Sequence, residues 1–335
     1  MPVKVSKRPR IGITMGDAAG IGPEIVLRAL SSWYARTAYR CVIIGDLANL
    51  KSVSRTYHIE VELVPFAADH QPESNTVEVF DLANLPDDFE IGVDSEVTGK
   101  AAAENLIASI NLWSHGKIDA IATAPISKKA IGLAGFNYQG HTEFLAELTN
   151  TSEFAMSFFA EKLRVVLLST HLPLVSAIES ITLERLAALI RFTDREMGRL
   201  LNKKVSIAVA GLNPHASEGG MFGSEEAEII APAIQECREA RIDVSGPFSP
   251  DTIFLRCFRG EFDACIALYH DQATIAVKSL SFGSGVNMTL GLPVIRTSVD
   301  HGTAYDIVGS GKADFSSMTA AIKLAGELVS MQASR

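Results

Sequence analysis

The sequence lacks what several classes of protein need. Only 4 of its 335 residues are cysteine and none forms Cys-x-x-Cys, which argues against a disulfide scaffold, a zinc ribbon or a thioredoxin-like site. No apolar run approaches the ~18 residues of a membrane-spanning helix. The basic start leads into an apolar segment too short for a secretory signal. These absences predict a protein of the reducing cytoplasm with no membrane partner.

Basic residues are also fewer than acidic residues. The chain has 30 Lys and Arg against 39 Asp and Glu, a formal net charge of −9 at pH 7. Because an acidic chain is a poor match for a phosphate backbone, we expect no nucleic-acid partner. Apolar residues, in contrast, make up 47% of the chain, which is enough for a sizeable core and excludes a mainly disordered protein.

Short apolar runs alternate with longer helical patterns. The runs are rich in Val and Ile, as in strands covered on both faces, and lie at 11–14, 41–45, 118–124, 163–170, 205–211, 264–269 and 292–299. Helices are predicted between them at 22–32, 97–114, 182–201, 224–240 and 315–330. This alternation predicts an α/β protein with largely parallel strands. Residues 67–90, with scattered Pro, Asp and Asn, are the best candidate for an irregular connection.

The standard nucleotide-binding loops are missing. Gly16, Gly20 and Gly22 follow a predicted strand and precede a helix, but their spacing is not G-x-G-x-x-G and no Walker A lysine follows. Pro23 is instead a helix-start signal. The spacing gives no support for a Rossmann site or a P-loop, so a dehydrogenase would have to hold its cofactor in another way.

Three histidines directly follow predicted strands. His171 comes after VVLLST, His215 after IAVAGLNP and His270 after CIALY. Functional groups of α/β sheets gather beyond the carboxyl ends of strands, and three imidazoles there could bind one divalent ion with positions left open for a substrate. The alternative is three polar loop residues, and the spacing leaves both interpretations open.

A second polar group borders the glycine-rich segment FGSGVN. Lys278, Asn287 and Arg296 lie on either side of it, and a lysine and an arginine beside a glycine loop could bind a phosphate or carboxylate. The alternative is a flexible turn with two solvated cations. The segment QGHTE, with His141 and Thr142, also interrupts an apolar region.

Eight segments, in order, now suggest a family. They are GDAAGIGPEI, GHTEF, STHLP, GLNPHASEGG, GPFSPDT, YHDQ, GSGVNMTLGLPVIRTSVDHGTA and GKAD. Together they resemble the 4-hydroxythreonine-4-phosphate dehydrogenase family of vitamin B6 synthesis, over nearly the whole chain. The first segment and DHGTAYDIVGSGKAD are also similar to the wider isocitrate and isopropylmalate dehydrogenase superfamily, which holds its dinucleotide in a non-Rossmann cleft.

The resemblance implies a domain organisation. It implies two α/β domains of the isocitrate/isopropylmalate dehydrogenase type with the active site in the cleft between them. Residues 1–130 plus 285–335 would form the cofactor-side domain, and residues 131–284 the central domain that carries the metal ligands and the dimer contacts. Family members are homodimers, so each site would borrow residues from both subunits.

The resemblance also implies roles for particular residues. His171, His215 and His270 would bind a divalent metal: zinc, or magnesium or cobalt in its place. The substrate, a phosphorylated hydroxy acid, would contact His141, Thr142, Lys278, Asn287 and Arg296. NAD or NADP would contact Gly283, Gly285, Leu290, Gly291, His301, Gly302, Thr303, Ala304 and Asp306.

The implied reaction is oxidation of the 3-hydroxyl of 4-phosphooxy-L-threonine by NAD or NADP. The metal would act as a Lewis acid on that hydroxyl, and the resulting β-keto acid would lose carbon dioxide to give 3-amino-2-oxopropyl phosphate. Asp251, Asp271 and Lys278 are the candidates for the catalytic base. The same chemistry on D-threonate or D-erythronate 4-phosphate is an open alternative.

Two departures from the family pattern bear on the substrate. Ser127 stands in TAPISKKA where vitamin B6 enzymes have a histidine, and Ala18 replaces a proline. Relatives that act on D-threonate or D-erythronate 4-phosphate often have a small polar residue at the position of Ser127, whereas GHTEF favours the B6 enzyme. Further alternatives are a dihydrodiol dehydrogenase, a phosphate acyltransferase and a catalytically inactive binding protein. Of these, the acyltransferase needs no metal triad.

Overall fold

The computed structural model describes residues 8–33, 39–67, 76–138, 140–281 and 285–333. The chain divides into two compact units. Unit 1 consists of Met1–Ser152 and Leu292–Ala333, and unit 2 of Glu153–Gly291. The resemblance puts the corresponding breaks after residues 130 and 284.

Unit 1 contains six parallel strands in the order β3-β4-β2-β1-β5-β12. They are β1 (Arg10–Thr14), β2 (Arg40–Gly45), β3 (Glu62–Pro65), β4 (Thr76–Asp81), β5 (Ala120–Thr123) and β12 (Ile295–Ser298). Ile11 and Ile13 of the central strand β1 are fully buried. All five pairings are parallel, so the carboxyl ends of these strands meet at one edge.

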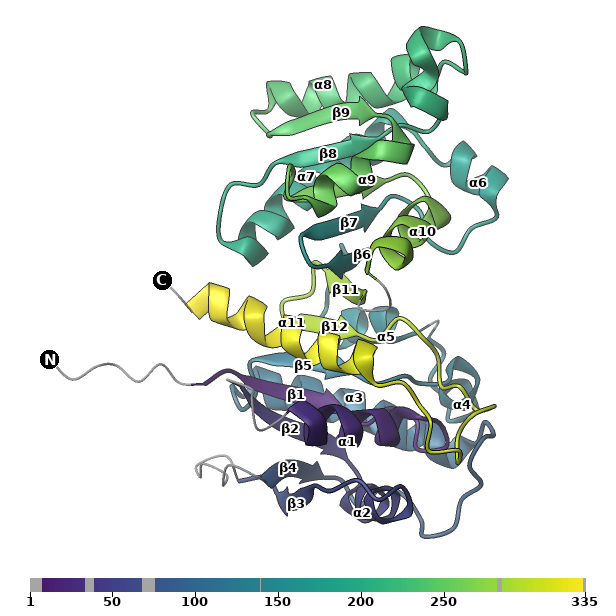
Figure 1. Cartoon of the computed structure of the whole chain (residues 1–335), viewed down its shortest axis with the longest axis vertical. Helices are drawn as coiled ribbons and strands as arrows, with labels where there is room; N and C mark the ends of the chain where they lie inside the picture. Colours follow the sequence, from purple (N-terminus) through teal and green to yellow (C-terminus); the bar gives the residue numbers. More distant parts are fainter. Residues whose placement is uncertain (1–7, 34–38, 68–75, 139, 282–284, 334–335) are drawn as a thin grey trace, which may run out of the picture. The chain divides into compact units, whose positions relative to one another are not determined.

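Helices cover both faces of this sheet. They are α1 (Gly22–Trp33), α2 (Leu47–Thr56), α3 (Glu96–Ser114), α4 (Lys128–Leu133), α5 (His141–Leu148) and α11 (Ser316–Ala333). Within this unit, α1 and α11 lie on one face of β1, β5 and β12, and α3 lies behind it (Figure 1). Ser95 caps α3 by accepting from the Thr98 N–H, a favourable N-cap contact.

Unit 2 contains six strands in the order β11-β6-β7-β10-β8-β9. They are β6 (Ala155–Ala160), β7 (Leu163–Leu167), β8 (Ile207–Ala210), β9 (Val244–Phe248), β10 (Ala264–Ala267) and β11 (Val286–Leu290). β6 is antiparallel to both β11 and β7, and the pairings from β7 through β10 and β8 to β9 are parallel. The four parallel neighbours β7, β10, β8 and β9 thus end at the same edge.

The helices of unit 2 also cover both faces. They are α6 (Leu174–Glu179), α7 (Leu183–Leu201), α8 (Ala231–Glu239), α9 (Pro250–Phe258) and α10 (His270–Ser281), with a 3₁₀ segment at Pro214–Gly220 and a π-helical turn at Glu226–Ile230. In Figure 1, α9 and α10 lie on one face of the strands of this unit and α7 on the other. Thr182 caps α7 through the Arg185 N–H.

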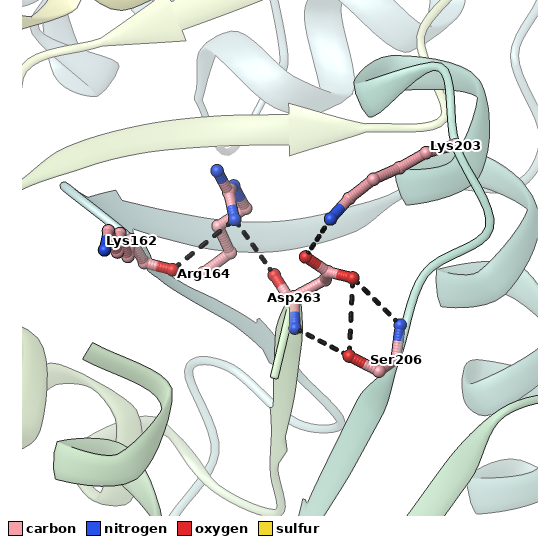
Figure 2. Close-up of polar contacts among 5 residues, drawn as sticks. All are labelled: Lys162, Arg164, Lys203, Ser206 and Asp263. Carbon is pink, nitrogen blue, oxygen red and sulfur yellow. Dashed lines mark hydrogen bonds and ion pairs between the residues drawn. The ribbon is translucent and has the colours of Figure 1, made fainter. Parts of the chain in front are cut away.

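A polar cluster ties together the amino-terminal ends of β7, β8 and β10 (Figure 2). Asp263 accepts from the Ser206 N–H at 3.1 Å and from the Lys203 ammonium group, and its carbonyl accepts from Arg164 at 3.2 Å. Burial alone would raise the pKa of Asp263, but the hydrogen bonds from Lys203 and Ser206 outweigh it and lower the pKa. The cluster therefore fixes the edge opposite to the one that carries the histidines.

All seven predicted strands and five predicted helices are confirmed, with ends shifted by a few residues. The prediction of an irregular connection over 67–90 is wrong for Thr76–Asp81, which forms β4. The strand was not predicted because it contains Glu78, and a charged residue is unexpected inside a buried strand. Glu78 is only 2% exposed and forms a two-pronged ion pair with Arg40 at 2.5 and 2.7 Å.

The antiparallel strand β6 and the strands β3, β9 and β11 were not predicted. All four cysteines are buried free thiols, and burial raises the pKa of Cys41 to about 12. Among the described residues, no helix is both long and apolar enough to cross a membrane.

Candidate functional site

The three histidines follow three neighbouring parallel strands of unit 2. His171 follows β7, His270 begins α10 after β10, and His215 follows β8. Because β10 lies between β7 and β8, the histidine-bearing loops leave the sheet side by side. The rings of His171 and His270 are 5.5 Å apart between centroids.

This histidine pair has the chemistry that a divalent ion requires. Nδ1 of His270 is 2.8 Å from Oδ1 of Asp271. A carboxylate at one ring nitrogen orients the ring and directs the other nitrogen to a metal, so Nε2 of His270 is the atom that would bind an ion. Within the described part of a single chain, no three His, Cys, Asp or Glu side chains form a metal-binding group. That His215 completes the site, with ligands from two chains, stays a prediction.

Buried hydrogen bonds join the histidine-bearing loops to one another. The Ser169 hydroxyl donates to the Leu268 carbonyl at 2.9 Å, which links the loop of His171 to the end of β10. Gln272 accepts from the Leu268 N–H and donates to the Gly211 carbonyl, both at 2.8 Å, which links that end to the loop of His215. Sequence reasoning missed Ser169 and Gln272, although each lies within two residues of a predicted ligand.

Unit 1 holds a buried cation. Arg296 of β12 is 2% exposed, and its Nε and Nη2 donate to the Thr123 hydroxyl of the neighbouring strand at 3.2 and 2.7 Å. Burial lowers the pKa of Arg296 to about 9, and Glu143 opposes this shift. The guanidinium group is therefore still charged at neutral pH.

His141 lies in the field of this arginine, at the first position of α5. Its half-buried ring is hydrogen-bonded to the backbone of Ala124, and burial and the charge of Arg296 lower its pKa well below the ordinary value. Its buried Nε2 has no hydrogen-bond partner among the described residues. An arginine, a polar ring atom and the positive end of a helix dipole together favour an anionic ligand.

The segment predicted to contact the dinucleotide forms the loop between β12 and α11 in unit 1. It carries His301, Gly302, Thr303, Ala304 and Asp306. The Thr303 carbonyl accepts from the Ile21 N–H at 3.0 Å, and a Cβ added at Gly20 would lie 2.7 Å from that carbonyl, so only glycine permits this approach. Nε2 of His301 is buried without a hydrogen-bond partner in the described ranges, and its contact with the dinucleotide stays a prediction.

A buried carboxylate fixes the same loop. Tyr305 donates to Asp17 at 2.8 Å, and Asp17 also accepts from the Ala19 N–H at 2.9 Å. Asp17 is fully buried, and this burial raises its pKa even though the hydrogen bonds from Tyr305, Ala19 and Thr98 oppose the shift. Sequence reasoning singled out neither Asp17 nor Tyr305.

Ser127 joins this group from the start of α4. Its hydroxyl donates to Asp94 and also caps α4 by accepting from the Ala130 N–H at 3.1 Å. Lys129 forms an ion pair with Asp94 at 3.4 Å, and the hydrogen bond from Ser127 is the main cause of the lowered pKa of Asp94. Ser127 thus has two structural partners of its own.

The remaining predicted residues belong to α9, α10 and β11 or border them. Asp251 is exposed in the first turn of α9 and accepts from the Ser249 hydroxyl at 2.5 Å. Lys278 is exposed on α10. Asn287 is half-buried in β11, and its Oδ1 is buried with no partner in the described part of the chain. Gly285, Leu290 and Gly291 border or belong to β11, and Gly283 lies outside the described residues.

Comparison with known proteins adds independent findings. Residues 37–325 match the family of the pyridoxal phosphate biosynthetic protein PdxA. The chain is 44% identical to a 4-hydroxythreonine-4-phosphate dehydrogenase of Desulforapulum autotrophicum, over 95% of each chain. It is 43% identical to a D-threonate 4-phosphate dehydrogenase of Salmonella typhimurium, over 95% of this chain and 98% of the relative.

A solved structure is similar over the same length. The crystal structure of 4-hydroxythreonine-4-phosphate dehydrogenase from Klebsiella pneumoniae has a TM-score of 0.88 and 39% identity, and the match covers 96% of this chain and 99% of that one. The mixed α/β fold predicted from the sequence is therefore confirmed.

Proposed function

This chain belongs to the family of the pyridoxal phosphate biosynthetic protein PdxA, and on that premise we propose that it oxidises the 3-hydroxyl of 4-phosphooxy-L-threonine. The family makes it a dehydrogenase of a phosphorylated hydroxy acid, which implies NAD or NADP as the oxidant. The proposal adds the substrate, the residues that bind it and a divalent metal ion.

The observation that carries this proposal is the buried cation of unit 1. Arg296 is held by Thr123, and His141 lies beside it at the start of α5, with an Nε2 that has no partner among the residues the structure describes. A buried arginine and a helix N-terminus are a strong combination for a phosphate group. We assign the phosphate group of the substrate to Arg296, His141 and Thr142. The other polar groups of the substrate are assigned to Lys278 and Asn287.

Different groups of residues are assigned to different steps of the reaction. A divalent ion held by His171, His215 and His270 would lower the pKa of the substrate hydroxyl and polarise the nascent ketone. NAD or NADP, held by the loop that carries His301 and Asp306, would supply the hydride acceptor, and Asp251, Asp271 or Lys278 would take the proton of the substrate hydroxyl. Asp271 orients His270 through Nδ1. The product is a β-keto acid, and loss of its carboxylate as carbon dioxide followed by protonation of the α-carbon gives 3-amino-2-oxopropyl phosphate.

A second candidate substrate is D-threonate 4-phosphate, and Ser127 favours it. At this position the vitamin B6 enzymes have a histidine, whereas here a short hydroxyl donates to Asp94 and caps α4. The position therefore offers no imidazole to a substrate. The named relatives divide between the same two substrates at nearly equal identity.

Side-by-side turnover separates these candidates. The purified protein is given NAD, a divalent metal and either 4-phosphooxy-L-threonine or D-threonate 4-phosphate, and NADH formation is followed. Turnover of the amino acid phosphate supports the proposal. Turnover of the D-acid phosphate alone would replace the substrate and keep the dehydrogenase chemistry. A Ser127→His variant that shifts the ratio toward the amino acid phosphate would assign the preference to this position.

A further inference from the structure

The loop that carries His215 has an unusual backbone. His215, Ala216, Ser217 and Glu218 all have positive φ, between 44° and 64°, and Gly219 follows at 70°. A left-handed conformation is strained for a residue with a Cβ, because the Cβ comes too close to the following carbonyl oxygen. Four such residues in succession persist only if the surrounding structure holds them, and such strain is concentrated at functional sites.

Glu226 holds the start of this loop. It is only 4% exposed. Its Oε1 accepts from the backbone N–H groups of Leu212 and Asn213 at 2.8 and 2.7 Å, and its Oε2 accepts from the Asn213 side-chain amide at 2.8 Å. Both oxygens of a buried carboxylate are therefore used on the two residues that lead into Pro214 and His215.

Glu226–Ile230 is a π-helical turn that precedes α8, and such turns are rare and are frequent at functional sites. Glu226 is buried, whereas Glu228, in the same turn, is exposed. The turn thus supplies two glutamates with opposite environments, one of which makes the loop contacts.

We propose that Glu226 is a positioning residue that holds the loop 211–219 in the conformation in which His215 binds the metal ion. This inference rests on the proposed function, since His215 is a predicted ligand. Partners that orient a ligand commonly contribute tenfold to hundredfold to metal affinity. Glu226→Gln keeps the size of the side chain, but its amide NH₂ would face the NH₂ of Asn213, so the loop loses one of its ties.

The test is metal binding, without turnover. Metal-free wild type, Glu226→Gln, Glu228→Gln and His215→Ala are titrated with cobalt(II) by calorimetry and by the visible absorption of the bound ion. We expect Glu226→Gln to bind about tenfold to hundredfold more weakly than wild type, with a changed cobalt spectrum. Glu228→Gln, the matched control, should bind as wild type does.

The outcomes separate the two proposals. If His215→Ala loses cobalt and Glu226→Gln binds it as tightly as wild type, the inference is wrong and the metal site stands. If His215→Ala binds as wild type does, the predicted ligand set itself is wrong. Should Glu226→Gln not fold, as judged by circular dichroism, Asn213→Ala is the second variant. It removes the side-chain bonds of Asn213 to Glu226 and Glu225 and keeps the two backbone bonds to Glu226. Unchanged cobalt affinity in that variant also overturns the inference.

Discussion

At the scale of single residues, the phosphate assignment depends on the shape of a guanidinium group as well as its charge. Nε and Nη2 of Arg296 both reach Thr123, an arrangement that a lysine cannot reproduce. We expect Arg296→Lys to raise KM for the phosphorylated substrate about tenfold to hundredfold, or ~1.5–3 kcal/mol, with a smaller change in kcat. Steady-state kinetics measure both constants. Arg191→Lys, an exposed arginine paired with Glu236, is the control.

Tyr305 tests the assignment of the cofactor loop. Tyr305→Phe removes the hydroxyl that donates to the buried Asp17 and leaves that carboxylate short of a donor. We expect a loss of ~1–3 kcal/mol in the free energy of unfolding and a raised KM for NAD. Urea unfolding and NAD-dependence of the rate check the two effects. An unchanged KM for NAD would show that the tether does not serve cofactor binding.

Residues were predictable from the sequence where their chemistry follows from position alone. His171 and His270 were singled out because each follows an apolar strand, and Arg296 because it borders a glycine-rich segment; the structure brings the two rings together and buries Arg296, and their functional roles stay predictions. Glu226, Gln272 and Asp17 were not found. Their roles depend on partners that folding brings close, such as Asn213 for Glu226 or Tyr305 for Asp17, and a single sequence contains no record of such pairs.

At the scale of helices and strands, Asp263 links three strand starts and its effect depends on pH. Its pKa is lowered in the folded protein, so its stabilisation is present above the ordinary carboxyl pKa of about 4 and is lost as pH falls through the lowered value. We expect Asp263→Asn to cost ~1–2 kcal/mol of unfolding free energy at neutral pH. The difference from wild type should shrink in acid.

Urea unfolding at neutral and acid pH measures this dependence. Glu261→Gln is the matched control, because Glu261 also pairs with a basic side chain, Arg256, but is exposed, and exposed pairs contribute little. An Asp263→Asn cost that stays constant down to acid pH would contradict the role of the carboxylate charge.

Element prediction succeeded for strands within apolar runs, such as β8 and β10, in which every residue is apolar and buried. It failed for β4, where Glu78 is buried by pairing with Arg40, and for β9, whose sequence VSGPF contains both Gly and Pro. A charge that is neutralised by a distant partner is invisible to a local pattern.

At the scale of the whole molecule, the division into two units was expected from the resemblance and from the chain's length. The predicted ligand histidines, with Lys278 and Asn287, belong to unit 2, whereas Arg296, His141 and the cofactor loop belong to unit 1. Turnover should therefore respond to changes in either unit. Loss of His215 and loss of Arg296 should each reduce kcat/KM without unfolding the protein.

The central claim is that the chain is a metal-assisted, NAD(P)-dependent dehydrogenase of a phosphorylated hydroxy acid. The most direct measurement follows NADH formation with 4-phosphooxy-L-threonine, and in parallel with D-threonate 4-phosphate, before and after a chelator and after metal is restored. We predict turnover that the chelator abolishes and that the metal restores in wild type but not in His215→Ala. Full turnover in the presence of the chelator, or no NADH from either substrate with metal supplied, would contradict the account.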